Sequence, residues 1–376
     1  MFRSSIKLFK IFGIEIRLDY SWFIIFALFA YYFGFSYFPS VLPGLNTSLL
    51  VIVTIVTVLL FFFSILFHEM SHSIVAIKMG IPVQRISLFI FGGMAQIEKE
   101  PDKPKTEFLM SIAGPLASFI LAGLFGIIWA VTKSIAPVVA SARYLALINI
   151  VLGVFNLLPG YPLDGGRVLR SIIWKATNNL KKATFVASTV GRVIGFLMIA
   201  VGIFFIFTGN FINGIWLAFI GWFLQTSAYM SYRQLIFDTS SKGYKVKDMM
   251  NENIVMVTDD LTLDHLVNNF FMKYRYGRFP VVEDMDMDTE KFVGVVSIHD
   301  VKGIRQEEWN TTTVREIVEE VSDKEIISLN AEVSEAIKQM NKNNLSHLVI
   351  LSGKKLIGMI TKSDVMQFIQ LLSELH

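Results

Sequence analysis

The chain has 376 residues, of which 53% are hydrophobic and 17% are charged, and its formal net charge is +3. Soluble domains carry about 25% charged residues, so this composition indicates a membrane protein, and the small net charge argues against nucleic acid as a partner. The chain has no cysteine, which excludes disulfides and thiolate metal ligands.

Charge is distributed unevenly along the chain. Residues 20–237 are poor in charge and rich in Phe, Ile and Leu, whereas residues 238–376 have the composition of a soluble domain. We therefore predict a membrane domain at 1–235, a linker at 236–244 and a soluble domain at 245–376.

The N-terminal segment has basic residues but no smooth apolar run that ends in a small-residue cleavage site. We therefore expect it to be retained rather than removed as a signal peptide. The alternation of Ile14, Ile16 and Leu18 predicts a short strand or an interfacial segment.

About 20 predominantly apolar residues cross a bilayer as a helix. Such stretches predict about six spans, at 21–38, 48–78, 108–132, 143–158, 187–207 and 212–232. Lys and Arg are concentrated before the first span, after the second and after the fourth. By the positive-inside rule, we expect a multi-pass protein of the cell membrane with both termini in the cytoplasm.

Between the second and third spans, residues 82–100 alternate apolar and polar side chains around Gly92 and Gly93. This pattern predicts a strand–turn–strand hairpin at or just inside the membrane face. A simple loop on the membrane surface is the alternative.

The soluble domain contains an internal repeat. The sequence FVGVVSIHDVKGI at 292–304 matches LIGMITKSDVMQF at 356–368. Each copy predicts a turn, strand, helix, strand, strand and helix, so we expect two α/β repeats at 245–305 and 311–372. An acidic insertion, DMDMDTE, lies within the first copy at 284–290.

Ionisable residues interrupt the second apolar stretch, where His68, Glu69 and His72 form the sequence HEMSH. Positions i and i+4 share one face of a helix, so both imidazoles can bind one zinc ion with Glu69 beside it. A third ligand would leave one position for water, whose pKa zinc lowers to about 7. Glu69 can then take the proton of this water and pass it to a leaving amine. Ionisable groups are unfavourable within a span, so packed structural histidines are the weaker interpretation.

The third ligand can be sought by elimination. The remaining histidines, His265, His299, His347 and His376, belong to the soluble domain, and Asp164 is the single acidic residue between 108 and 237. Asp164 is expected on the same cytoplasmic side as the end of the HEMSH helix, and the glycines after it permit close approach of the backbone. The competing carboxylates are Asp19, Glu98, Glu100, Asp102 and Glu107.

Two motifs together resemble the site-2 protease family of intramembrane zinc metalloproteases. These are HEMSH within a span and N-x-x-P-x-x-x-x-D-G from Asn156 to Gly165. AGPLAS at 113–118 and GIEIRLDYSW at 13–22 are also similar to members of this family. The resemblance implies that Asp164 is the third zinc ligand and that Asn156 positions or stabilises the substrate carbonyl. A hydrogen bond that packs helices is the alternative role for Asn156.

The resemblance also implies a use for the hairpin. A transmembrane helix satisfies its backbone hydrogen bonds internally, so it must unwind before hydrolysis. We expect an unwound substrate to add as a strand near residues 86–97, which would hold the bond to be cut beside the zinc.

The two soluble repeats resemble cystathionine-β-synthase (CBS) domains, which occur as tandem pairs and bind adenine nucleotides. The shared pattern G-x-x-[ST]-x-x-D runs from Gly294 to Asp300 and from Gly358 to Asp364. The resemblance implies that ATP, ADP or AMP contacts a hydroxyl and a carboxylate in each copy, namely Ser297, Asp300, Thr361 and Asp364. Repeats that bind nothing and serve as a homodimer scaffold are the alternative.

The predicted fold is therefore a polytopic α-helical membrane protein with a membrane-associated β-hairpin, followed by a soluble α/β pair of CBS domains. The predicted function is a zinc metalloendopeptidase that cuts in or near a transmembrane segment of a membrane-bound regulator. Adenine nucleotide at the CBS pair is expected to modulate it. A CBS-gated transporter or channel with a metal-transit site is the alternative, although the membrane domain has no internal repeat and Glu69 suits catalysis.

Overall fold

A computed structural model gives the fold of the chain. It describes residues 5–90, 92–97, 99–240, 243–251, 254–283, 291–353 and 355–375, without the side chains of 237–240 and 369–375. Glu98, the acidic insertion at 284–290 and His376 lie outside the described residues. The chain divides into two units, Met1–Leu235 and Ile236–His376, and each is described by itself.

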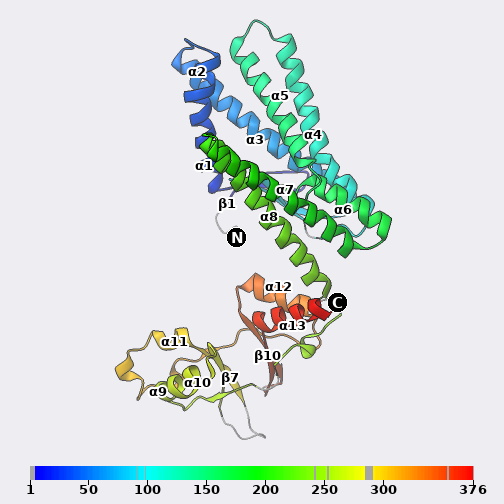
Figure 1. Cartoon of the computed structure of the whole chain (residues 1–376). Helices are drawn as coiled ribbons and strands as arrows, with labels where there is room; N and C mark the ends of the chain where they lie inside the picture. Colours follow the sequence, from blue (N-terminus) through cyan, green and yellow to red (C-terminus); the bar gives the residue numbers. More distant parts are fainter. Residues whose placement is uncertain are drawn as a thin grey trace. The chain divides into compact units, whose positions relative to one another are not determined.

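Among the described residues of the first unit, six segments are long and apolar enough to cross a membrane (Figure 1). The first combines α1 (Ser21–Tyr32), a π-helical turn (Phe33–Tyr37) and α2 (Phe38–Val41), and the others are α3 (Thr47–Lys78), α4 (Pro104–Val131), α5 (Ala136–Asn156), α7 (Leu180–Phe207) and α8 (Phe211–Ser240). A shorter helix, α6 (Asp164–Thr177), lies between α5 and α7. The prediction of about six spans is confirmed.

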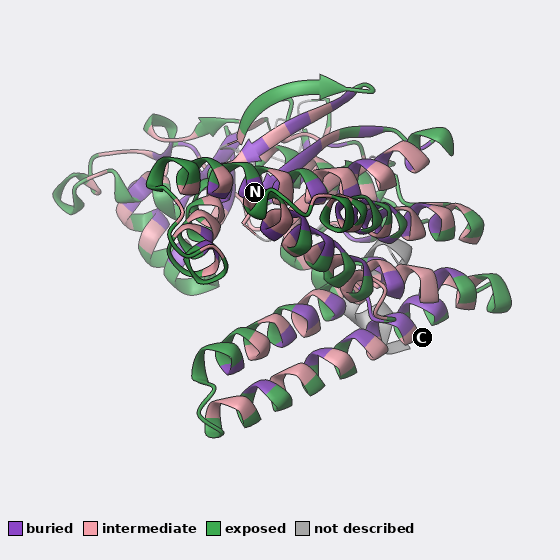
Figure 2. Ribbon diagram, turned by 90° about the horizontal axis from the view of Figure 1, so that it is seen from above, coloured by how far each residue is buried: buried purple, intermediate pink, exposed green. Residues whose placement is uncertain are grey.

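The second span, α3, has two chemically different faces. Ile52, Val56, Leu59 and Phe63 recur every three or four residues and are exposed, whereas Ser64 and His68 are buried. Exposed residues recur along the other long helices as well (Figure 2). Apolar side chains outside and polar ones inside are what a helix bundle in lipid requires.

A four-stranded sheet in the order β1-β2-β3-β4 accompanies the helices. Its strands are β1 (Ser5–Ile11), β2 (Ile14–Asp19), β3 (Val83–Phe89) and β4 (Gly92–Ile97). The β3–β4 hairpin confirms the predicted one, although Gly92 and Gly93 begin β4 opposite Phe89 and Leu88 rather than forming its turn. The alternation at 14–18 becomes β2, which pairs in parallel with β3.

The second unit contains the two predicted repeats. The first comprises β5 (Val257–Thr258), α9 (Leu263–Leu266), a π-helical turn (Val267–Phe271), α10 (Met272–Tyr274), β6 (Arg278–Val282), β7 (Phe292–Ser297) and α11 (Ile298–Lys302). The second comprises β8 (Glu319–Glu320), α12 (Val333–Asn343), β9 (His347–Ser352), β10 (Lys355–Thr361) and α13 (Lys362–Leu375). In both, two antiparallel strands lead into a helix.

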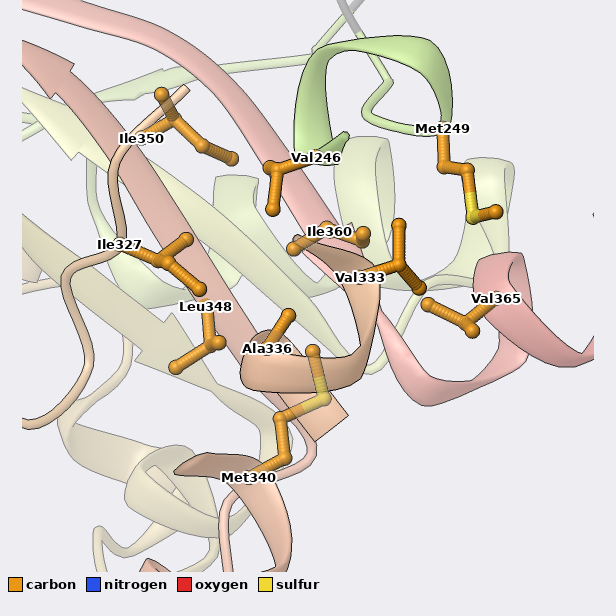
Figure 3. Packing of buried hydrophobic residues seen from close by; sticks show 10 residues of the cluster. All are labelled: Val246, Met249, Ile327, Val333, Ala336, Met340, Leu348, Ile350, Ile360 and Val365. Atoms are coloured by element: carbon orange, nitrogen blue, oxygen red, sulfur yellow. The ribbon is translucent and has the colours of Figure 1, made fainter. Parts of the chain in front are cut away.

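The two repeats exchange their first segments. Val246 and Met249 open the first repeat but pack in the core of the second, against Val333, Leu348 and Ile360 (Figure 3). Val314 opens the second repeat and packs in the core of the first. Each hydrophobic core therefore requires both repeats, which explains why the pair forms one unit.

Candidate metal centre

Three side chains from two helices converge inside the first unit. His68 and His72 lie one turn apart on α3, and Asp164 is the first residue of α6. Asp164 Oδ2 is 3.1 Å from Nε2 of both histidines, and the two Nε2 atoms are 3.2 Å apart. His68 is buried, and His72 and Asp164 are half-buried.

This triangle fits a zinc ion. Zinc lies about 2.0–2.1 Å from imidazole nitrogen and carboxylate oxygen, so tetrahedral ligand atoms are separated by about 3.3 Å. The observed separations of 3.1–3.2 Å are close to that value. Two nitrogens and one oxygen match the donor set of a catalytic zinc site, which keeps its fourth position open.

The other nitrogen of each imidazole is also engaged. His68 Nδ1 lies 2.9 Å from Ser118 Oγ, and His72 Nδ1 lies 2.6 Å from the carbonyl oxygen of Met110. Both partners belong to α4. An Nδ1–H that donates to an oxygen leaves Nε2 as the metal-binding nitrogen, so α4 fixes the tautomer and orientation of both rings.

Two glycines make room for the site. A Cβ on Gly114 of α4 would overlap Nε2 of His72 and would lie 2.6 Å from Nε2 of His68. A Cβ on Gly93 of β4 would overlap Glu69, at 3.1 Å from its Cδ. A helix and a strand thus approach the site as closely as backbone can.

The loop from α5 to α6 positions Asp164. Gly165 and Gly166 are buried, and a Cβ on either would overlap backbone atoms of residues 157–161. The glycines that follow Asp164 therefore let α6 begin directly against this loop. Asn156, the last residue of α5, donates from Nδ2 to the carbonyl oxygen of Leu152 at 3.0 Å. Its predicted role toward the substrate stays a prediction.

Among the described residues, the competing carboxylates are engaged elsewhere or lie apart from this group. Asp19 Oδ1 accepts from the backbone N–H of Ser21 at 3.0 Å and from its hydroxyl at 2.7 Å. Glu107 is buried in an ion pair with Arg170. Among the described residues, the one group of three or more metal-ligating side chains is that of His68, His72 and Asp164.

The residues predicted to bind nucleotide in the CBS unit form hydrogen bonds with one another at the N-terminal ends of α11 and α13. Asp300 Oδ2 accepts from the N–H and hydroxyl of Ser297 at 2.7 and 2.8 Å. Asp364 Oδ2 accepts from the N–H and hydroxyl of Thr361 at 2.8 and 2.7 Å. The same capping arrangement occurs in both repeats.

A cavity of about 180 Å³ adjoins Ser297 and Asp300. His347 and Arg278 also line it, and Arg278 Nη1 lies 2.7 Å from His347 Nδ1. Burial and the charge of Arg278 lower the pKa of His347. The wall of this cavity also contains three glutamates, namely Glu319, Glu320 and Glu325.

Sequence reasoning did not connect Gly93, Gly114, Ser118 or the carbonyl of Met110 with the metal site. A signal was present for two of these residues, because Gly114 and Ser118 belong to AGPLAS. Small residues within a span indicate close helix packing. Which helix they contact is decided by the fold.

Membrane-length helices that enclose a HExxH helix with a third ligand define the class of intramembrane metalloproteases. The model of peptidase family M50 matches residues 56–141 and 130–201, and the CBS domain model matches 246–306 and 314–371. A zinc metalloprotease of Methanocaldococcus jannaschii is 31% identical over 98% of this chain and 97% of its own. The chain belongs to peptidase family M50, the site-2 protease family of zinc metalloproteases, and carries a pair of CBS domains.

Two further proteins are similar to the chain. A Synechocystis protein provisionally named as a zinc metalloprotease is 31% identical over 98% of this chain and 96% of its own. The solved structure of a site-2 protease from Methanocaldococcus jannaschii covers 60% of this chain and 94% of its own, with 30% identity and a TM-score of 0.42. The predicted family, fold class and enzyme type are confirmed, and the protein is a multi-pass membrane protein.

Proposed function

We propose that this metalloprotease hydrolyses a peptide bond in or near a transmembrane segment of a membrane-bound regulator. The observation that carries the proposal is the convergence of His68, His72 and Asp164 on one point within a membrane-length helix bundle. A site at this depth serves a substrate that is itself in the membrane.

Different residues of the chain would bind zinc, transfer the proton and orient the substrate. His68, His72 and Asp164 would hold zinc, which when bound acts as a Lewis acid and lowers the pKa of water. Glu69 lies next to His68 on α3 and accepts a proton from the attacking water, then returns it to the leaving amine. Asn156 is the candidate to orient the substrate carbonyl.

Strand β4 is the candidate dock for the unwound substrate. It lies at the edge of the sheet and, among the described strands, pairs with β3 alone, so one side of its backbone can take another strand. Gly93 near its start packs against Glu69. A strand added to β4 would thus pass beside the proposed proton acceptor.

The orientation of the chain follows from its loops. Arg and Lys residues flank the ends of the spans that lie next to HEMSH and Asp164, which supports a cytoplasmic location for both termini and the CBS unit. The cut would then release the cytoplasmic part of a regulator from lipid.

The proposal also includes the predicted domain boundaries, with the membrane domain ending at residue 235 and the linker ending at residue 244.

Adenine nucleotide at the CBS pair is the proposed modulator. The cavity beside Ser297 and Asp300 supports it, because hydroxyl and carboxylate groups suit ribose and Arg278 suits phosphate. The carboxylates in its wall favour AMP over the more anionic ADP and ATP. Dimerisation through the repeats stays a prediction.

The substitution Glu69→Gln tests the proposed reaction. We expect cleavage of a transmembrane reporter by the purified protein to fall by about 10²- to 10⁴-fold, because proton transfer is lost. Zinc content, measured by atomic absorption, should stay at the wild-type level. The matched control is Glu283→Gln, since Glu283 is half-exposed in an ion pair with Lys291 of the CBS unit.

Two results would contradict the proposal. Undiminished cleavage by Glu69→Gln would exclude the proposed role of this carboxylate. Zinc flux across proteoliposomes without cleavage of any reporter would instead favour a transporter.

A further inference from the structure

A basic cavity of about 470 Å³ lies between the β3–β4 hairpin and α6. Arg85 and Ser87 of β3, Met94 and Gln96 of β4, and Arg167 and Arg170 of α6 contribute to its wall. These β3 and β4 residues pair across the hairpin and so share one face of the sheet. The cavity therefore adjoins the strand that we propose as the substrate dock.

The cavity carries an excess of positive charge. Arg85, Lys99, Arg167 and Arg170 line it, and among the described lining residues Glu100 is the single acid. The guanidinium of Arg170 is already neutralised, because its Nε donates to Glu107 Oε1 at 2.5 Å. Arg85 donates from Nε to Gln96 Oε1, also at 2.5 Å.

Among the arginines described in this wall, Arg167 is the one with neither an ion pair nor a hydrogen bond from its side chain. Across the described part of the chain, its guanidinium forms no ion pair and no hydrogen bond, and its contact is with the ring of Tyr161, 5.8 Å from the centroid. Arginine remains protonated in proteins and presents five donors, so a half-buried guanidinium without an acceptor is prepared for an incoming anion.

The position of Arg167 indicates which anion it meets. It follows Asp164 by three residues on α6, so the two side chains lie on the same helix face, with Cβ atoms about 5–6 Å apart. A substrate strand on β4 advances by about 3.3 Å per residue. A side chain that reaches Arg167 therefore belongs to a residue within about four positions of the scissile bond.

We propose that Arg167 is a specificity-determining residue that binds an acidic side chain of the substrate close to the scissile bond. This inference rests on the proposed proteolysis and adds a substrate class to it, an extended membrane-protein segment with Asp or Glu near the cut. The positive charge of the cavity suits either an acidic side chain or an anionic lipid headgroup, and its place beside β4 favours the side chain of a docked substrate.

A series of transmembrane reporter peptides tests the inference on the purified full-length protein in nanodiscs. Each of the four positions on either side of the cut carries Glu, Gln or Lys in turn. We expect Glu to be preferred over Gln at one position by about tenfold, because a charge-assisted hydrogen bond is gained, and the difference should lie in KM. Arg167→Gln should abolish this preference, and Arg167→Glu should transfer it to Lys.

Matched controls separate charge recognition from a structural effect. Arg192 lies 5.8 Å over the ring of Tyr229, the same contact that Arg167 makes with Tyr161, but it does not line the cavity. Arg192→Gln should keep the Glu preference. Arg167→Lys should retain part of it, and the thermal midpoint of each variant checks folding.

Each remaining outcome has a defined meaning. Equal cleavage of all peptides by the wild type, or a Glu preference that survives Arg167→Gln, overturns the inference while leaving proteolysis intact. A cleavage rate that depends on phosphatidylglycerol in the nanodisc through Arg167, without any peptide preference, would indicate that the cavity binds lipid. This result would also overturn the inference. Failure of the wild type to cut any peptide would contradict the proposed function itself.

Discussion

The candidate residues of the membrane unit and those of the CBS unit are held in different ways. His68, His72 and Asp164 come from two helices almost a hundred residues apart and meet at separations of 3.1–3.2 Å. Asp300 and Asp364 instead accept hydrogen bonds from residues three positions before them. Three metal-binding side chains that converge from distant segments with these separations fit a shared metal ion, whereas a local cap is explained by its own helix.

The largest difference between the two units is expected when a proposed metal ligand is replaced. We expect Asp164→Ala to weaken zinc binding by more than about 100-fold, because loss of a supporting hydrogen bond alone weakens it by about 10- to 100-fold. Cleavage should fall to background. Zinc titration with a competing chelator measures the affinity, and Asp300→Ala in the CBS unit should leave it unchanged. Equal zinc affinity in both variants would remove Asp164 from the ligand set.

Crowding at Gly114 should have the next largest effect. Gly114→Ala places a methyl group where Nε2 of His72 lies, so the imidazoles must move and cleavage should fall by about 100-fold. Gly123→Ala is the matched control, because no atom lies within 4 Å of its added Cβ on the same helix. Reporter cleavage and zinc content should remain at the wild-type level in the control. Similar losses in both variants would indicate a general effect on α4.

Ser118→Ala tests the support of His68. Loss of the hydroxyl 2.9 Å from His68 Nδ1 should weaken zinc binding by about 10- to 100-fold while leaving the fold intact. Ser231→Ala removes a hydroxyl that donates to Ser227 within α8 and should leave zinc binding unchanged. An unchanged zinc affinity in Ser118→Ala would show that the tautomer of His68 is fixed without this contact.

Substitutions that remove the helix caps of the CBS unit should have smaller effects, and these should be on stability alone. Asp364→Ala removes the acceptor for two donors of Thr361 and should lower the free energy of unfolding by about 1 kcal/mol. Asp300→Ala should have a similar effect, and the exposed Asp260→Ala should have little. Hydrogen exchange of peptides from α11 and α13 in the full chain measures the difference. A nucleotide role would appear as a separate loss of binding.

The smallest predicted effect is a dependence on pH. Burial and Arg278 hold the pKa of His347 below its usual value, so the unfolded chain binds more protons than the folded one once pH falls below about 6.5. The stability of the CBS unit should therefore decrease on acidification through this range. Hydrogen exchange of β9, corrected for intrinsic rates, checks it. His347→Gln should flatten the slope, and a stability that rises on acidification would contradict the assignment.

Local chemistry made much of the membrane unit predictable. The six spans follow from runs of apolar residues, and the pairing of His68 with His72 follows from helical spacing. Asp164 could be selected by elimination because the membrane domain has so few acidic residues. The duplicated sequence likewise predicted two α/β repeats in the soluble unit.

Contacts between distant segments could not be predicted in this way. The parallel pairing of β2 with β3, the exchange of Val246 and Val314 between repeats, and the approach of Gly114 to both histidines depend on packing. In the sequence, Arg167 contributes to the basic residues after the fourth span, but one arginine after a loop has no spacing that indicates a binding role.

The sequence by itself determined which residues could bind a metal and on which helix two of them lie, because composition and helical periodicity are local properties. Only the tertiary structure decided that α4 supplies Ser118 and the carbonyl of Met110 to orient the two rings, and that Arg167 faces the cavity beside β4. Those arrangements require backbones from separate segments to approach closely. Such approach is fixed by the shapes of whole helices and strands in contact, not by any one stretch of the chain.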